Sequence, residues 1–124
     1  MDQCRTFVLG ALLLGSVSVA GQTPESGGTL RRQLTDALTQ VAKGTCSETL
    51  LGPLVLAACE QQLSRMQPAL QSLGAITGLR YRGVEQMPTG VQAEVYRVTF
   101  AKGQTVWMVA AGPNGKLTVL YSPG

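Results

Sequence analysis

Residues 78–121, GLRYRGVEQMPTGVQAEVYRVTFAKGQTVWMVAAGPNGKLTVLY, decide the fold of this chain. Apolar and polar side chains alternate along much of the stretch, which is typical of strands with one buried face. Turn signals divide it at Pro88–Gly90, Lys102–Gly103 and Pro113–Gly115, where proline and glycine favour tight reversals. The stretch therefore predicts four short strands in an antiparallel meander.

The same alternation predicts which side chains share a face of the sheet. Arg80 and Arg82 lie on one face of the first strand, and Arg97 lies opposite Tyr96 and Val98 on the second. If these strands pair, the three arginines form a candidate binding face for an anionic ligand or an acidic protein surface, through bidentate hydrogen bonds. The alternative is a solvated face, on which the arginines discourage aggregation.

Trp107 is the only tryptophan of the chain. It lies in Val106–Ala111, a stretch that is apolar on both faces and therefore predicts a central strand. A large ring in such a strand indicates a core anchor or a dimer-interface anchor, rather than a residue that stacks on a ligand.

Helices are expected before the sheet. Residues 29–43 carry apolar side chains at helical spacing, and Gly44 suits the end of a helix. A second apolar stripe follows between residues 56 and 73. Helices that precede an antiparallel meander predict an α+β domain, in which the N-terminal helices pack on one face of the sheet.

The chain between these helices carries two conflicting signals. Thr45–Glu48 (TCSE) matches a capping box, which predicts that a helical stretch opens there. Gly52–Pro53 then interrupts that stretch, and Pro53 suits the first turn of a new helix. Within the new helix, Pro68 predicts a kink or a split near Gln67, because proline donates no backbone hydrogen bond.

Cys46 and Cys59 predict one disulfide if the chain is exported. In an unbroken helix the two residues would lie about 20 Å apart, whereas a disulfide needs Cα atoms within about 7 Å. The bond therefore requires the chain to turn back near Gly52–Pro53, where the sequence independently predicts a break. The alternative is that Cys59 is a buried free thiol. Two cysteines without histidine cannot complete a tetrahedral metal site.

The N-terminus indicates the compartment. Residues 1–20 have a short polar head with Arg5, an apolar run and small residues at Ser18 and Ala20, which predicts a secretory signal peptide cleaved after Ala20. The apolar run is shorter than the roughly 20 residues of a membrane span. Residues 21–28 predict a flexible leader, and residues 29–124 a single domain. We expect a periplasmic or secreted bacterial protein without a membrane anchor after cleavage.

The composition argues against catalysis. The chain has no histidine, and Asp36 is the only aspartate left after cleavage. Glu85 and Glu94 are predicted near strand ends, but nothing in their spacing predicts that the two carboxylates face each other. We therefore expect no acid–base pair. No catalytic residue, cofactor site or metal site is therefore expected. A net charge of +3, spread along the chain, does not predict nucleic-acid binding.

Residues 60–122 resemble the C-terminal part of small cystatin-like domains of the nuclear transport factor 2-like, or SnoaL-like, superfamily. The resemblance rests on turn glycines and strand spacing, at Leu73–Gly74, Gly83, Tyr96, Val98, Phe100, Gly103, Trp107 and Asn114–Leu117. It implies a cystatin-like fold with a cavity between helices and sheet. Similar domains occur as exported bacterial proteins and beside serine hydrolases of the β-lactamase type. Their sheets often pair face to face, so the resemblance implies a homodimer as one arrangement.

These expectations converge on a non-catalytic exported binding module, which takes a protein or a small ligand through its sheet face or its helix–sheet cavity. One alternative is a periplasmic inhibitor or immunity-type protein that blocks a secreted hydrolase or toxin. Another, implied by the resemblance, is a SnoaL-like enzyme that acts on a small molecule. A deep cavity with a polar group would favour a small ligand, and a filled interior beside an exposed apolar patch would favour a protein partner.

Overall fold

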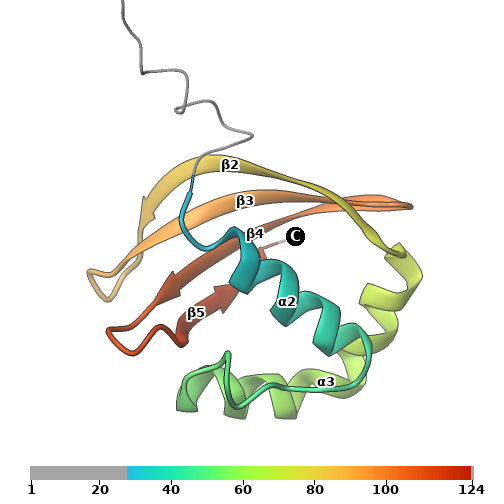
Figure 1. Ribbon diagram of the computed structural model, residues 1–124, viewed down its shortest axis with the longest axis horizontal. Helices are drawn as coiled ribbons and strands as arrows, with labels where there is room; N and C mark the ends of the chain where they lie inside the picture. Colours follow the sequence, from blue (N-terminus) through green and yellow to red (C-terminus); the bar gives the residue numbers. More distant parts are fainter. Residues whose placement is uncertain (1–27, 124) are drawn as a thin grey trace, which may run out of the picture.

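The computed structural model describes residues 28–123. Two helices, α2 (Arg31–Ala42) and α3 (Pro53–Leu73), precede a four-stranded antiparallel sheet, which confirms the predicted α+β class. Figure 1 shows both helices on the same, concave side of the curved sheet. The predicted signal peptide, residues 1–20, and residues 21–27 of the predicted leader lie outside the described residues.

The sheet is the predicted meander. Its strands, in spatial order, are β2 (Ile76–Gln86), β3 (Gln92–Phe100), β4 (Gly103–Ala111) and β5 (Leu117–Tyr121). Tyr81 on β2 pairs with Tyr96 on β3, and Tyr96 pairs with Trp107 on β4. One row of aromatic side chains therefore crosses three strands on the face that the helices cover.

The core lies between α2 and this face of the sheet. The buried residues of α2 follow helical spacing, at Leu34, Ala37, Leu38 and Val41. They meet inward residues of the strands, among which Tyr96, Val98 and Val109 are fully buried. Burying such apolar side chains contributes about 1.5–3 kcal/mol each, so this contact supplies much of the free energy that holds helix and sheet together.

The predicted helical stretch at Thr45–Glu48 is wrong. A single turn forms there, closed by a hydrogen bond from Leu51 N–H to Ser47 O (3.0 Å), and it does not continue. The cause is tertiary, because the following backbone pairs with the edge of β5. Leu117 N–H donates to Leu50 O (2.8 Å), and Gly52 N–H donates to Leu117 O (2.9 Å). These bonds form a short parallel bridge that a helix would break.

Helix α3 is continuous over 21 residues, so Pro68 does not split it. Pro53 occupies the first turn, as predicted. The last part of the helix bends towards β2 (Figure 1), as expected from the backbone hydrogen bond that Pro68 cannot donate. Gly74, with φ of 85°, ends the helix and lets the chain reverse into β2.

Cys46 and Cys59 form the predicted disulfide, with Cα atoms 6.0 Å apart. The chain turns back at Gly52–Pro53, where α3 begins, as the distance argument required. The loop that the disulfide closes includes Leu50–Gly52, the segment that pairs with β5. The disulfide thus ties the segment on the sheet edge to α3.

Candidate functional site

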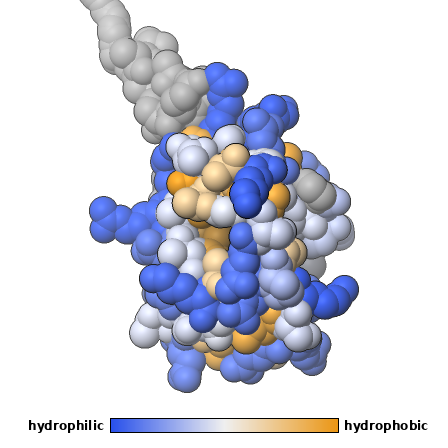
Figure 2. Space-filling model, turned by 90° about the vertical axis from the view of Figure 1, so that its right-hand side faces the viewer, coloured by the Kyte–Doolittle hydropathy of each residue, from blue (hydrophilic) through white to orange (hydrophobic). Residues whose placement is uncertain are grey.

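A cavity opens where the two helices meet the beginning of the sheet. Its volume is about 450 Å³, within the range of small-molecule sites. Its largest apolar side chains come from both helices and from the sheet: Leu38 of α2, Leu70 of α3, Ile76 of β2 and Phe100 of β3. Figure 2 looks onto this end of the molecule and shows hydrophobic atoms in a hollow between hydrophilic side chains. We call this space the helix–sheet cavity.

Small residues leave room for the helix–sheet cavity. Ala42, Gly74 and Ala75 line it at the points where both helices end and β2 begins. The last part of α3 bends towards β2 (Figure 1), and Leu70 and Gln71 in this part of the helix line the cavity. Larger residues at Ala42 or Ala75 would occupy space that is now open.

Polar groups surround the helix–sheet cavity at the helix ends. Gln71 Nε2 donates a hydrogen bond to Ala42 O (2.8 Å) and so joins the end of α3 to the end of α2. Thr35 Oγ1 is engaged within α2, where it donates to Arg31 O (2.8 Å). Lys43 is exposed, and it is the one charged residue among the described residues that line the cavity. The arrangement joins an apolar interior to a cationic rim, which suits binding and orientation of a ligand.

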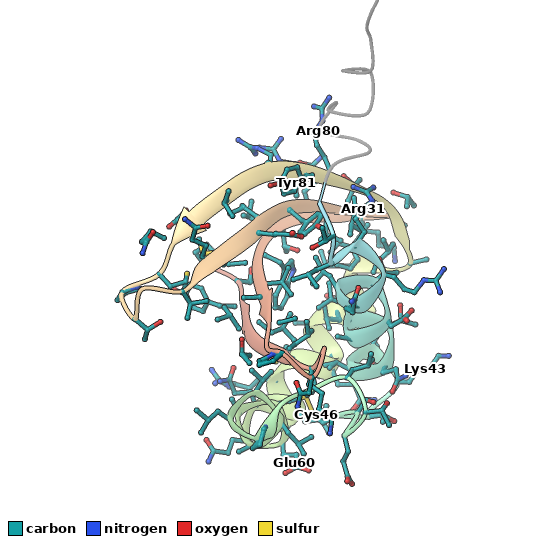
Figure 3. The ribbon with its side chains drawn as sticks, turned by 60° about the vertical axis from the view of Figure 1, so that its left-hand side comes forward. Arg31, Lys43, Cys46, Glu60, Arg80 and Tyr81 are labelled. Atoms are coloured by element: carbon teal, nitrogen blue, oxygen red, sulfur yellow. A yellow bond between two sulfur atoms is a disulfide. The ribbon has the colours of Figure 1, made fainter. Side chains whose placement is uncertain are left out.

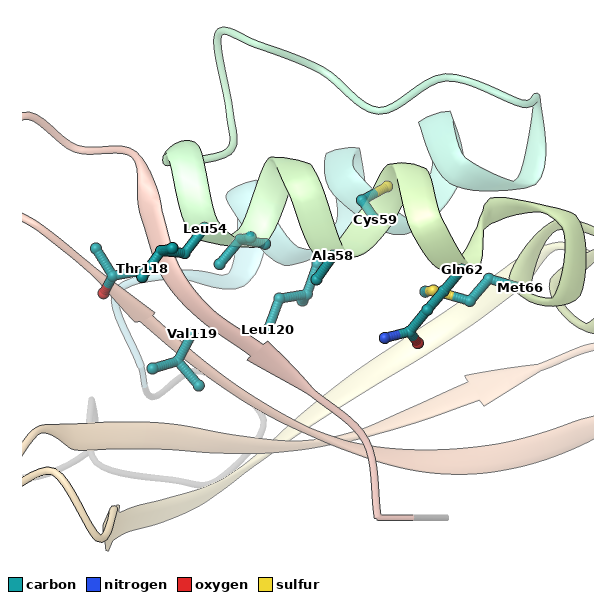
Figure 4. A pocket seen from close by; sticks show the side chains of 9 residues that line it. Leu54, Ala58, Cys59, Gln62, Met66, Thr118, Val119 and Leu120 are labelled. Atoms are coloured by element: carbon teal, nitrogen blue, oxygen red, sulfur yellow. The ribbon is translucent and has the colours of Figure 1, made fainter.

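A smaller recess lies between α3 and β5 (Figure 4). Its volume is about 220 Å³, and we call it the β5 groove. Leu54 forms part of its α3 wall and is 86% exposed, an unusual exposure for so large an apolar side chain. Val119 and Leu120 contribute the β5 side, and the disulfide-bonded Cys59 also lines the groove.

The three predicted arginines are all exposed, and two of them pair directly. Arg80 pairs directly with Arg97 across β2 and β3, and both side chains are exposed. Figure 3 shows Arg80 pointing away from the helices. Arg82 falls at a register shift between Tyr81 and Gly83 and has no Cα partner on β3. Arg82 is exposed like Arg80, with which it alternates along β2. The candidate binding face of Arg80, Arg82 and Arg97 stays a prediction.

Trp107 lies in the core. Its side chain is only 6% exposed, and its indole Nε1 donates a hydrogen bond to Thr105 Oγ1 (2.8 Å). Of the two roles that the sequence left open, the structure places the ring as a core anchor, because a ring buried beneath the helices cannot also face a partner subunit.

Glu94 is the residue that sequence reasoning did not single out. Its carboxylate accepts hydrogen bonds from the backbone N–H groups of Thr29 (2.9 Å) and Leu30 (3.0 Å) and from the Tyr96 hydroxyl (2.6 Å). Helix α2 has no side-chain cap of its own, and Glu94 supplies from β3 an acceptor for the N–H of its N-cap residue, Leu30, as the glutamate of a capping box does. The alternation contained a signal for it, since Glu94 shares the buried parity of Tyr96 and Val98.

Glu94, Tyr96 and Arg31, which we call the Glu94 cluster, interact mainly with one another and with the backbone of this chain. Burial raises the pKa of Glu94, but the hydrogen bonds from Thr29, Tyr96 and Leu30 outweigh burial and leave the pKa below its ordinary value of 4.5. Burial and the bond to Glu94 raise the pKa of the Tyr96 hydroxyl. The Arg31 guanidinium lies 6.0 Å from the centroid of the Tyr96 ring and donates to Leu79 O (2.7 Å). These groups bond to one another, so we assign the cluster to holding α2 on the sheet.

Two further features of residues 28–123 bear on the site. No group of three or more His, Cys, Asp or Glu side chains in this range is placed to hold a metal ion. Neither helix combines the length and the apolar character that a membrane span requires.

No protein-family model matches this chain, and neither a curated protein nor a solved structure matches it. The cystatin-like resemblance of residues 60–122 therefore stays a prediction.

Proposed function

We propose that this chain is a non-catalytic, exported binding domain that takes a small apolar ligand in the helix–sheet cavity. The cavity itself carries the proposal, because its volume of about 450 Å³ is lined mainly by apolar side chains and bordered by a few polar groups. This combination is typical of small-molecule sites, in which apolar contact supplies affinity and a few polar groups supply orientation.

The exported location rests on the predicted signal peptide. The disulfide between Cys46 and Cys59 is compatible with it, because disulfides persist mainly in oxidising compartments. Such a location would expose the domain to small molecules of the periplasm or the medium.

The proposal is tested by titrating the protein, purified after expression of the full chain, with N-phenyl-1-naphthylamine. This uncharged apolar probe fluoresces strongly in apolar surroundings. Ala42→Leu adds volume at a residue that lines the helix–sheet cavity, whereas Ala69→Leu adds the same volume at an exposed residue of α3 outside the lining. We expect the wild type and A69L to bind the probe alike. A42L should bind it about tenfold more weakly, because the larger side chain occupies part of the cavity and the probe would then be overpacked.

Two results would contradict the proposal. Equal binding by A42L and A69L would exclude the helix–sheet cavity as the site. Absence of binding by the wild type, with the protein shown to be folded by circular dichroism, would contradict an apolar ligand altogether.

The β5 groove favours a second candidate function, the binding of a protein by an inhibitor or immunity-type domain. Leu54 presents an almost fully exposed apolar side chain beside this groove, as expected of an anchor for a partner. Bait protein should then capture one partner from periplasm or medium near stoichiometrically. Leu54→Glu should abolish the capture, and Glu60→Gln, an exposed change on α3 outside the groove, should not. Capture that survives L54E would contradict this function.

A further inference from the structure

We propose that the ligand of the helix–sheet cavity is an amphiphile with an apolar tail and an anionic head group, and that Lys43 binds the head group at the rim. This inference rests on the proposed function of the cavity and names its ligand class. It comes from the distribution of charge and of satisfied hydrogen-bonding groups around the opening.

The tail is inferred from the inner lining. Leu38, Leu70 and Phe100 surround the space, and Leu38 and Phe100 belong to the buried core itself. A polar ligand placed against these side chains would lose its hydrogen bonds to water without replacement, which is unfavourable. The part of the ligand that enters the cavity must therefore be apolar.

The head group is inferred from Lys43. This residue caps the C-terminus of α2, lines the cavity and is exposed. No residue within 28–123 forms a hydrogen bond or an ion pair with its ammonium group. Figure 3 shows Lys43 at the end of α2, pointing outwards. A lysine in such a place can lay its aliphatic stem along apolar surface while its charge stays at the water boundary.

The backbone at this rim does not offset that positive charge. Two helices end beside the cavity, and free carbonyl groups at helix C-termini would favour a cationic ligand. Five of these carbonyl oxygens already accept hydrogen bonds from donors of this chain, at distances of 2.8 to 3.2 Å. They belong to Gln40, Val41 and Ala42 of α2 and to Gln71 and Leu73 of α3. These bonds reduce the pull of the helix ends on a cation, and the Lys43 ammonium is the full charge that the cavity lining offers to a ligand.

Neighbouring residues on α2 agree with an anionic head group. Thr39 lines the cavity one turn before Lys43, and residues four apart lie on the same face of a helix. Its exposed hydroxyl can donate a second hydrogen bond to an oxyanion. Asp36 is the one acidic residue of α2, and it does not line the cavity. It lies about two turns before Lys43.

The experiment measures displacement of N-phenyl-1-naphthylamine by four ligands that share a ten-carbon tail: decanoate, decyl sulfate, decanol and decyltrimethylammonium. Wild type is compared with Lys43→Ala, and with Lys116→Ala as the control. Lys116 lies on the β4–β5 turn and outside the cavity lining. All titrations use concentrations below micelle formation.

We expect K43A to bind decanoate and decyl sulfate about fivefold more weakly, the effect of losing one exposed ion pair. Decanol should bind wild type and K43A equally, and K116A should behave as wild type with every ligand. The fivefold difference should shrink in 0.5 M NaCl, because salt screens an exposed pair. The relative affinities of decanoate and decyl sulfate then identify which oxyanion the rim prefers.

The inference is overturned if K43A leaves the anions unaffected, if it weakens decanol equally, or if wild type prefers decyltrimethylammonium to decanoate. Those outcomes would leave the cavity as an apolar ligand site, because the probe itself carries no charge. Failure of the probe to bind would instead remove the proposed function, and the inference with it.

Discussion

The carboxylate of Glu94 on β3 accepts a hydrogen bond from the backbone N–H of Leu30, 64 residues earlier in the chain (3.0 Å). A strand thereby caps a helix. The first N–H groups of a helix have no intrahelical partner, and a charged acceptor there also interacts favourably with the helix dipole. The contact fixes where α2 starts and how it sits on the sheet, which in turn sets the position of the residues that α2 contributes to the helix–sheet cavity.

Replacing Glu94 should therefore destabilise the whole domain. We expect Glu94→Ala to lower the free energy of unfolding by about 1–2 kcal/mol, the cost of losing a helix cap. Urea unfolding followed by circular dichroism measures it. Glu85→Ala, which removes an exposed carboxylate from β2, is the control and should have little effect. Equal behaviour of the two variants would show that α2 does not depend on this cap.

The same contact gives the protein a defined response to acid. The pKa of Glu94 is lower in the folded chain than its ordinary value, so its stabilisation is fully present above the unfolded-state pKa. That contribution is lost as the pH falls through the folded-state pKa. The stability difference between wild type and E94A should thus be largest near neutral pH and should shrink as the pH is lowered, at constant ionic strength. A difference that grew on acidification would contradict this assignment.

Removal of the disulfide should lower the free energy of unfolding at least as much as loss of the Glu94 cap does. Cys46 and Cys59 are 13 residues apart, and closing a loop of about that length contributes about 3 kcal/mol in the chain-entropy model. Urea unfolding of wild type is compared with the Cys46→Ser/Cys59→Ser double variant. Mass spectrometry after alkylation without reductant should show both cysteines protected. Two alkylated thiols in the exported protein would refute the bond.

Removal of the Trp107 ring should be the most damaging of these changes. The ring is buried in the core, so Trp107→Ala is expected to lower the free energy of unfolding by about 3–5 kcal/mol. If this variant does not fold, Trp107→Phe keeps a ring and gives a smaller, measurable loss. A loss below 1 kcal/mol for the alanine variant would contradict the buried position.

Pro68 offers the opposite test, since its replacement should stabilise the protein. The residue is exposed inside α3 and leaves one backbone carbonyl of the helix without its usual donor. Pro68→Ala restores this donor, and we expect a gain of about 1–3 kcal/mol in the free energy of unfolding. A loss of stability would show instead that the packing of Leu70 requires the bend.

The sheet could be predicted because its signals are local. Alternation and turn residues between Leu79 and Tyr121 predict four strands without reference to the rest of the chain. The disulfide was also predictable, since the break at Gly52–Pro53 and the two cysteines constrain each other. The buried parity of Tyr96 and Val98 followed from the same alternation.

The errors share one physical cause, which is contact between distant segments. The capping-box pattern at Thr45–Glu48 predicted a helix, and the hydrogen bonds of Leu50 and Gly52 to Leu117 prevented one. The residues that line the helix–sheet cavity and the partners of Glu94 come from elements that are far apart in sequence. Alternation places Glu94 on the buried face of its strand but does not identify these partners.

The parallel bridge at Leu117 has a consequence for association between chains. A strand at the edge of a sheet can template the addition of another chain through its unpaired backbone groups. Leu50 and Gly52 use both main-chain groups of Leu117 and so cover the beginning of the β5 edge. Their segment lies in the loop closed by Cys46 and Cys59. The disulfide therefore restrains the segment that covers the start of this edge, and we expect the reduced protein to add further chains there more readily.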